Sequence, residues 1–199
     1  MLIEYEAPRL RTMKPLTLPD FIEGNRLILR KHQLEDAALM FESIERDRER
    51  LSRFLPWPPL IKNVDDELAY LKDTHRWWSA QTLFDYGLFR KEGKLYMGNL
   101  GVHSIQWQHD CCELGYWILS DFEGGGFMAE AVGALERVLF EVGFYRIEIR
   151  CDVDNHRSAQ LPKRCGYRLD GTLRGATRVA SGYRDTLVFS KLRADGETS

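Results

Sequence analysis

The stretch "ELGYWILSDFEGGGFMAEAV", from Glu113 to Val132, is the most informative about the fold, because a strand-like segment runs through three glycines into a helical pattern. Apolar residues recur at helical spacing after the glycines, and Gly143 follows where a C-terminal cap belongs. A helix of about 16 residues is therefore expected. Its apolar residues are Met128, Ala131, Val132, Leu135, Val138, Leu139 and Val142.

The glycines at 124–126 have two interpretations. They can form a tight turn between a strand and a helix, or they can bare backbone amides so that an anion binds at the helix N-terminus. The nucleotide P-loop requires a Lys followed by Ser or Thr, which is missing here, and the dinucleotide fingerprint requires a final glycine where Ala129 stands. Neither motif fits, which disfavours a nucleotide-binding module.

The segments on either side of this stretch predict an α/β fold with a mixed sheet. Short polar connectors predict an antiparallel meander for the three strands that end at Ser120. The connection from Ser120 to Tyr145 contains the long helix, so it predicts a right-handed crossover and one parallel strand pair. Strands are expected at 25–31, 84–91, 95–107, 111–120, 145–153, 166–174 and 183–192. Further helices are expected at 35–50, 65–81 and 155–165.

Length and composition indicate one globular domain. The chain has 199 residues, of which 44% are hydrophobic and 29% charged, as in folded soluble proteins. We expect an irregular arm at 1–20, where three prolines lie, a single domain at 21–194 and a tail at 195–199. The net charge of -2 argues against a dedicated nucleic-acid binder, which usually carries a basic face.

The chain is expected to be cytoplasmic. Charged residues interrupt its first 20 positions as no secretion signal would allow, and no uncharged apolar run is long enough to span a membrane. The four cysteines show neither C-x-x-C nor a zinc-like spacing with histidine, so reduced, mostly buried thiols and no metal are expected.

Six stretches, in order, resemble the GNAT acyl-CoA N-acyltransferase family. The resemblance is to its RimJ/RimL-like group, which acetylates protein N-termini and, in other branches, small amines. It spans about residues 25–192 and implies a mostly antiparallel seven-strand sheet, one parallel pair splayed around acetyl-CoA, and helices on both faces. The stretches are "NRLILRKHQLEDAALMF", "FLPWP", "GNLGVHSI", "ELGYWILSDFEGGGFMAEAV", "CDVDNHRSAQLPKRCGYRLDGTLR" and "GYRDTLVFSKL".

The resemblance implies that the glycine loop wraps the diphosphate of coenzyme A through backbone amides. Two positions depart from the family pattern. Glu123 is acidic where Gln, Arg or an aromatic residue is usual, and it should repel a diphosphate unless it turns to solvent. Met128 replaces a small residue. The positions assigned to coenzyme A are Ile118, Leu119, Glu123, Gly124, Gly125, Gly126, Phe127, Met128, Ala129, Asn155, Ser158 and Lys163.

Amide formation from a thioester needs an unprotonated amine, donors for the oxyanion and a proton for the departing thiolate. By resemblance, Ser158 is the first choice to donate that proton, with Tyr167 behind it. Pro162 complicates this assignment, because it removes the amide that would bond the Ser158 carbonyl. Glu113 is the first choice for the base and His103 the second; an ordinary solvated carboxylate is the alternative for Glu113.

The acceptor site is expected between the first two helices and the "YRD" segment. Trp57, His103 and Tyr183 are assigned to it, and Trp77 and Trp78 are further candidates for its wall. The expected function is an acetyl-CoA-dependent N-acetyltransferase that works by direct transfer in a ternary complex. Its acceptor is expected to be a protein N-terminal amine, with a ribosomal protein as the first choice. The alternatives are a polyamine-like or aminoglycoside amine, or a non-catalytic acyl-CoA-binding protein. The family also suggests a homodimer.

Overall fold

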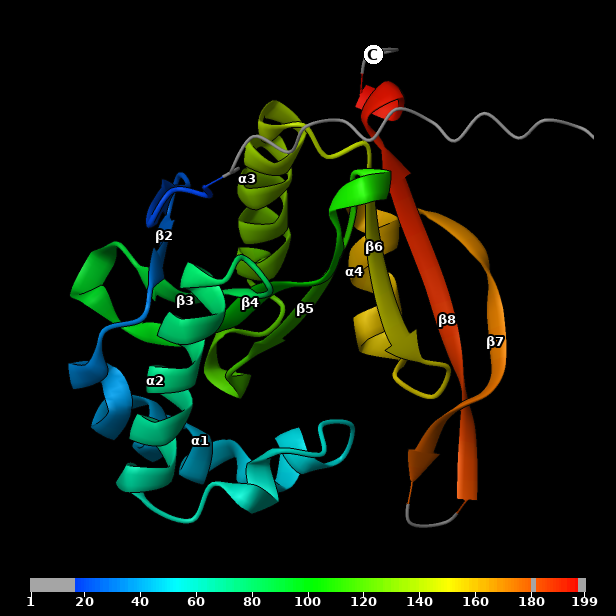
Figure 1. The fold of residues 1–199 in the computed structure, drawn as a ribbon. Helices are drawn as coiled ribbons and strands as arrows, with labels where there is room; N and C mark the ends of the chain where they lie inside the picture. Colours follow the sequence, from blue (N-terminus) through cyan, green and yellow to red (C-terminus); the bar gives the residue numbers. More distant parts are fainter. Residues whose placement is uncertain (1–16, 180–181, 197–199) are drawn as a thin grey trace, which may run out of the picture.

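The protein folds around one eight-stranded sheet in the order β1-β2-β3-β4-β5-β6-β8-β7 (Figure 1). A computed structural model describes residues 17–179 and 182–196. Most of the expected N-terminal arm therefore lies outside the described residues. The strands are β1 Phe21–Glu23, β2 Leu27–Lys31, β3 Phe84–Arg90, β4 Tyr96–Gln106, β5 Cys111–Ile118, β6 Arg146–Asp152, β7 Arg168–Val179 and β8 Gly182–Leu192.

One strand pair is parallel, β5 with β6, and every other neighbouring pair is antiparallel. The mixed sheet and its single parallel pair were both predicted. The sheet has one strand more than the seven expected, because β1 folds back on β2 through a hydrogen bond from the Gly24 amide to the Leu27 carbonyl, 2.9 Å long. Three residues are too few for an alternating pattern to reveal this strand.

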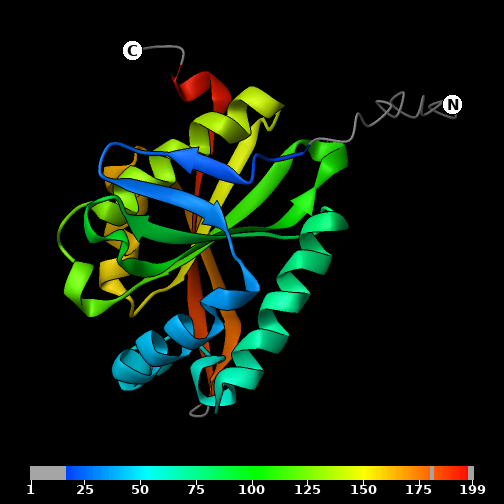
Figure 2. The same cartoon turned by 90° about the vertical axis from the view of Figure 1, so that its left-hand side faces the viewer.

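In the part of the chain that the structure describes, four α-helices cover the two faces of the sheet, as the resemblance implied. Helices α3 and α4 pack on one face, where Leu135 of α3 lies in the larger core with Leu114 and Ile149. Helices α1 and α2 pack on the other face, where Met40 and Leu71 share a smaller core. Figure 2 places α2 on the opposite side of the sheet from α3. The helices are α1 Ala37–Ser52, α2 Val64–Ser79, α3 Phe127–Val142 and α4 His156–Arg164.

Helix α3 is the helix predicted after the glycines, and it has 16 residues. Gly126 at its N-cap has φ 77° and Gly143 at its C-cap has φ 122°, conformations that residues with a Cβ rarely adopt. No helix of the described residues is long and apolar enough to cross a membrane.

Strands β5 and β6 separate toward their C-terminal ends. Their register pairs Cys111 with Arg146 and continues to Leu114 with Ile149, whereas β5 runs on to Ile118. The last residues of β5, next to the glycine loop, therefore have no strand partner on the β6 side among the described residues. The three cavities of the candidate site meet at this point.

Candidate active site

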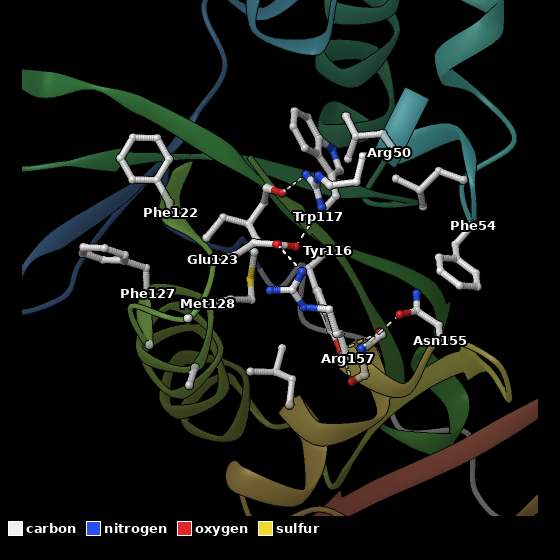
Figure 3. Close-up of a pocket in the computed structure, with 18 of the residues that line it drawn as sticks. Arg50, Phe54, Tyr116, Trp117, Phe122, Glu123, Phe127, Met128, Asn155 and Arg157 are labelled. Carbon is white, nitrogen blue, oxygen red and sulfur yellow. Dashed lines mark hydrogen bonds and ion pairs between the residues drawn. The ribbon is translucent and has the colours of Figure 1, made fainter. Parts of the chain in front are cut away.

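A cleft lies between the end of α1, the end of β5, the glycine loop and the start of α4 (Figure 3). It has a volume of about 260 Å³. Of the positions assigned to coenzyme A, Leu119, Gly125 and Lys163 do not line it. The assigned positions that do line it are Ile118, Glu123, Gly124, Gly126, Phe127, Met128, Ala129, Asn155 and Ser158.

The glycine loop is held in place by Arg26, the residue just before β2. The Arg26 guanidinium donates to a Glu130 carboxylate oxygen at 2.8 Å and to the Gly125 carbonyl at 3.0 Å, and its backbone amide donates to Glu130 at 2.7 Å. The same guanidinium lies 4.4 Å from the centre of the Phe127 ring. These contacts fix the first turn of α3 and the loop that precedes it.

Glu123 is neither isolated nor turned to solvent. Its carboxylate accepts from Arg50 at 2.7 Å and pairs with Arg157 at 2.5 Å, and Figure 3 shows it between the two guanidinium groups. Arg53 and Arg164 also line the cleft, where Glu123 is the only carboxylate among the lining residues. The cleft therefore carries a net positive charge beside the amides of a helix N-terminus, which suits an anionic ligand.

Sequence reasoning missed these arginines. Arg157 occupies an unassigned position between Asn155 and Ser158, and Arg50 lies at the end of the first predicted helix, outside its apolar stripe. Arg50 reaches Glu123 across 73 residues of sequence. No local pattern contains a contact of that separation.

Ser158 lies at the start of α4, where the Asn155 side chain caps the helix by accepting from the Ser158 amide at 3.1 Å. Pro162 withholds the amide that would bond the Ser158 carbonyl, and the Tyr116 hydroxyl takes its place at 3.1 Å. The same hydroxyl lies 3.1 Å from Ser158 Oγ. The two hydroxyls share a hydrogen bond in which either oxygen can be the donor. The proline thus fixes the serine through Tyr116, whose role was not predicted.

Tyr167 is not brought to this cleft. It lies in the larger core, 4% exposed, and does not line any of the described cavities. Burial, and then the nearby Glu136 carboxylate, raise the pKa of its hydroxyl.

Glu113 and His103 line a second cleft, which also contains Tyr116, Asn155 and Ser158. They are opposite each other in the register of β5 and β4. Burial raises the pKa of the Glu113 carboxyl, against the lowering effect of His103 and of Arg150, whose Nε lies 3.5 Å away. A half-buried carboxyl with a raised pKa is what a base near neutral pH requires. Tyr183, by contrast, is 70% exposed and lines none of these cavities.

A third cavity lies between α1, α2 and the face of β3, β4 and β5. Trp57 and His103 line it, as expected of an acceptor site, and the Trp57 ring lies 5.5 Å from that of Trp117. Trp78 instead packs in the larger core. Trp77 packs edge-to-face with Tyr70. Tyr116 lines all three cavities, so they meet at the unpaired end of β5.

The four cysteines are free, and all but Cys165 are buried. Among the described residues, no group of three or more His, Cys, Asp or Glu side chains is placed to hold a metal ion.

The family model described as "Acetyltransferase (GNAT) domain" matches residues 26–168. The ribosomal-protein-serine acetyltransferase of Escherichia coli (strain K12) is 25% identical over 157 residues, which cover 77% of this chain and 85% of that protein. RimJ of Mycobacterium smegmatis, solved with CoA-disulfide, superposes with a TM-score of 0.82 at 20% identity over 91% of each chain. RimL, a ribosomal L7/L12 alpha-N-protein acetyltransferase solved with coenzyme A, gives 0.82 at 21% identity over 86% of this chain and 97% of its own. At these identities the solved structures establish the fold.

Proposed function

The chain belongs to the acetyltransferase (GNAT) family, and on that premise we propose that it acetylates a protein N-terminal amine by direct attack on acetyl-CoA in a ternary complex. The observation that carries the proposal is the meeting of three cavities at Tyr116: one positively charged, one containing Ser158 and Glu113, and one open to an acceptor. The chain is an acetyl-CoA-dependent N-acetyltransferase of the GNAT type.

The residues of the first cleft fit coenzyme A. Gly124 has φ 74° and would carry no clash if it had a Cβ, so both its backbone and its surroundings leave room for a phosphate. The loop amides and the N-terminus of α3 supply donors and positive potential. Arg50 and Arg157 supply full positive charges. Their guanidinium groups pair with Glu123 in the ligand-free protein and would pair with the diphosphate when the coenzyme binds. The unpaired backbone of β5 offers hydrogen bonds to an extended pantetheine arm.

The reaction needs two proton transfers. The amine nitrogen attacks the thioester carbonyl and loses a proton to Glu113, directly or through a water. The carbon–sulfur bond then breaks, and the thiolate takes a proton from the Ser158 hydroxyl while a solvent water returns one to the serine oxygen. Tyr116 orients that hydroxyl, 3.1 Å from its own. Positioning of the two reactants supplies much of the rate, since few side chains are chemically required.

The first candidate for the acceptor is the N-terminal amine of a ribosomal protein. The support is the E. coli relative, which is named as a ribosomal-protein-serine acetyltransferase. The third cavity is wide enough for a residue following the amine, with a volume of about 390 Å³.

Thiol release from acetyl-CoA, followed with N-terminal peptides of ribosomal proteins and confirmed by mass spectrometry, tests this function. Turnover with an N-terminal serine peptide is expected, together with coenzyme A binding in a calorimetric titration. Coenzyme binding without turnover on any peptide or small amine would leave a non-catalytic binding protein, and no coenzyme binding would overturn the assignment of the first cleft.

Glu113→Gln tests the proposed base, with Glu42→Gln as the matched control because Glu42 is exposed on α1. Loss of the base is expected to lower kcat by roughly 10²-fold and to change the pH dependence of kcat. If kcat is unchanged, Glu113 has no part in the mechanism.

A further inference from the structure

The third cavity contains a buried carboxylate with nothing to neutralise it. Glu67, in the first turn of α2, is 1% exposed and lines this cavity. Among the described residues its side chain has no hydrogen bond and no ion pair, and the charge that acts on it is that of Asp85, of the same sign. A buried carboxylate without a partner is costly to ionise, and a cation that enters the cavity would offset that cost.

Asp85 adds a second carboxylate from β3. Its Oδ2 accepts from Tyr70 at 2.9 Å and from Asn99 at 2.7 Å, and lies 3.1 Å from His32 Nε2. No hydrogen bond of the described residues uses its Oδ1. Gly101 leaves that oxygen open, because a Cβ there would lie 3.1 Å from it. One end of the cavity therefore presents the Asp85 carboxylate, which its hydrogen bonds hold in a fixed orientation.

The other walls of the cavity suit a positive charge. Among the described residues neither Lys nor Arg lines it, although His103 does, and its lining includes the rings of Trp57, Tyr70, Tyr116 and Trp117. Aromatic faces attract ammonium and guanidinium groups, most strongly where water is excluded. An anion would meet two carboxylates, and a neutral apolar group would leave Glu67 unpaired.

We propose that this cavity binds an ammonium or guanidinium group of the acceptor, with Glu67 as its counter-ion. This inference rests on the proposed function, because the cavity shares Leu55, Tyr116 and Trp117 with the coenzyme cleft. The amine that attacks acetyl-CoA must lose its proton, whereas a group paired with Glu67 keeps its own. The acceptor therefore carries a second basic group beyond the amine that is acetylated.

Binding of small probes to the ligand-free protein tests cation recognition without any acetyl transfer. Titration with 1-aminopentane and with 1-pentanol, followed by tryptophan fluorescence, compares an ammonium with a hydroxyl of the same size. The amine is expected to bind about tenfold more tightly or better, as a charged hydrogen bond provides. Glu67→Gln should remove that preference, and Glu42→Gln should preserve it.

A second comparison uses the transfer reaction. The substrates 1,5-diaminopentane and 5-amino-1-pentanol have the same length and differ only in the group distant from the reacting amine. The diamine should have a kcat/KM about tenfold higher, chiefly through KM, and the difference should vanish in Glu67→Gln. Gly101→Ala crowds Asp85 Oδ1 without changing the charge of the cavity. It should lower the affinity for both 1-aminopentane and 1-pentanol.

The outcomes separate the two proposals. If 1-aminopentane binds no better than 1-pentanol, or if Glu67→Gln binds both as the wild type does, the cation site is wrong whether or not the protein transfers acetyl groups. If the Glu67-dependent preference is present but no amine releases thiol from acetyl-CoA, the cation site stands and the proposed transfer does not.

Discussion

Replacing Glu67 with Gln should stabilise the ligand-free protein at pH 8 much more than at pH 5. Burial, and then the like charge of Asp85, raise the pKa of the Glu67 carboxyl from 4.5 to about 7. Below pH 4.5 the carboxyl is protonated in both the folded and the unfolded chain. Between pH 4.5 and 7 only the unfolded chain ionises freely, so stability falls as pH rises, and above pH 7 the whole cost of ionising the buried group is present.

The size of the effect follows from the same pKa. The difference between 4.5 and about 7 corresponds to about 3 kcal/mol of unfolding free energy at pH 8 and to less than about 1 kcal/mol at pH 5. The glutamine is neutral at both pH values, so packing costs of the new amide are common to the two measurements. The gain on substitution should therefore be about 2 to 3 kcal/mol larger at pH 8 than at pH 5.

Urea unfolding at the two pH values, followed by tryptophan fluorescence, measures this difference. Glu42→Gln is the control, because its carboxyl is exposed on the same protein. The ionisable groups that are electrostatically coupled to Glu67, namely Asp85, Tyr70 and Tyr96, are present in both proteins. An equal change in stability at pH 5 and pH 8 would mean that Glu67 is not ionised at a cost in the folded chain.

Three further predictions concern the cleft and the core. Glu123→Gln frees Arg157 for the diphosphate and should tighten coenzyme A binding by about 1 kcal/mol in a calorimetric titration; weaker binding would mean that Glu123 serves to shape the loop. Ser158→Ala should lower kcat by roughly 10²-fold while the Kd for coenzyme A changes less than about twofold, and an unchanged kcat in stopped-flow thiol release would exclude the serine as proton donor. Leu135→Ala, at a fully buried position of α3, should lower the unfolding free energy by about 2 to 5 kcal/mol in urea; a loss below about 1 kcal/mol would mean that the core refills the space.

The elements of the fold were predictable because their patterns are local. Helix α3 and its two glycine ends follow from periodicity and from backbone conformations that only glycine adopts readily. The parallel pair follows from the helical crossover between β5 and β6. The three-residue strand β1 was missed, since its pairing with β2 and not its own pattern makes it a strand.

The candidate site was predictable only in part. The glycine loop, Ser158, Glu113 and Trp57 were singled out from the sequence, and each lines a cavity that meets the others at Tyr116. Tyr167 was expected near the thiolate, but its side chain faces the core. A motif therefore predicts where a residue lies along the chain better than it predicts the direction in which its side chain points.

Local patterns in the sequence are enough to place the helices and strands, the loop with its bare amides and the family pattern. The charges of the site depend instead on tertiary packing. Three acidic residues open α2, a pattern that the helix dipole favours at the surface, and packing buries one of them, Glu67, against Asp85. Tyr116 replaces the hydrogen bond that Pro162 removes, across 42 residues of sequence. Burial and long-range pairing determine what a charged or hydroxyl group does, and neither is a property of the neighbouring sequence.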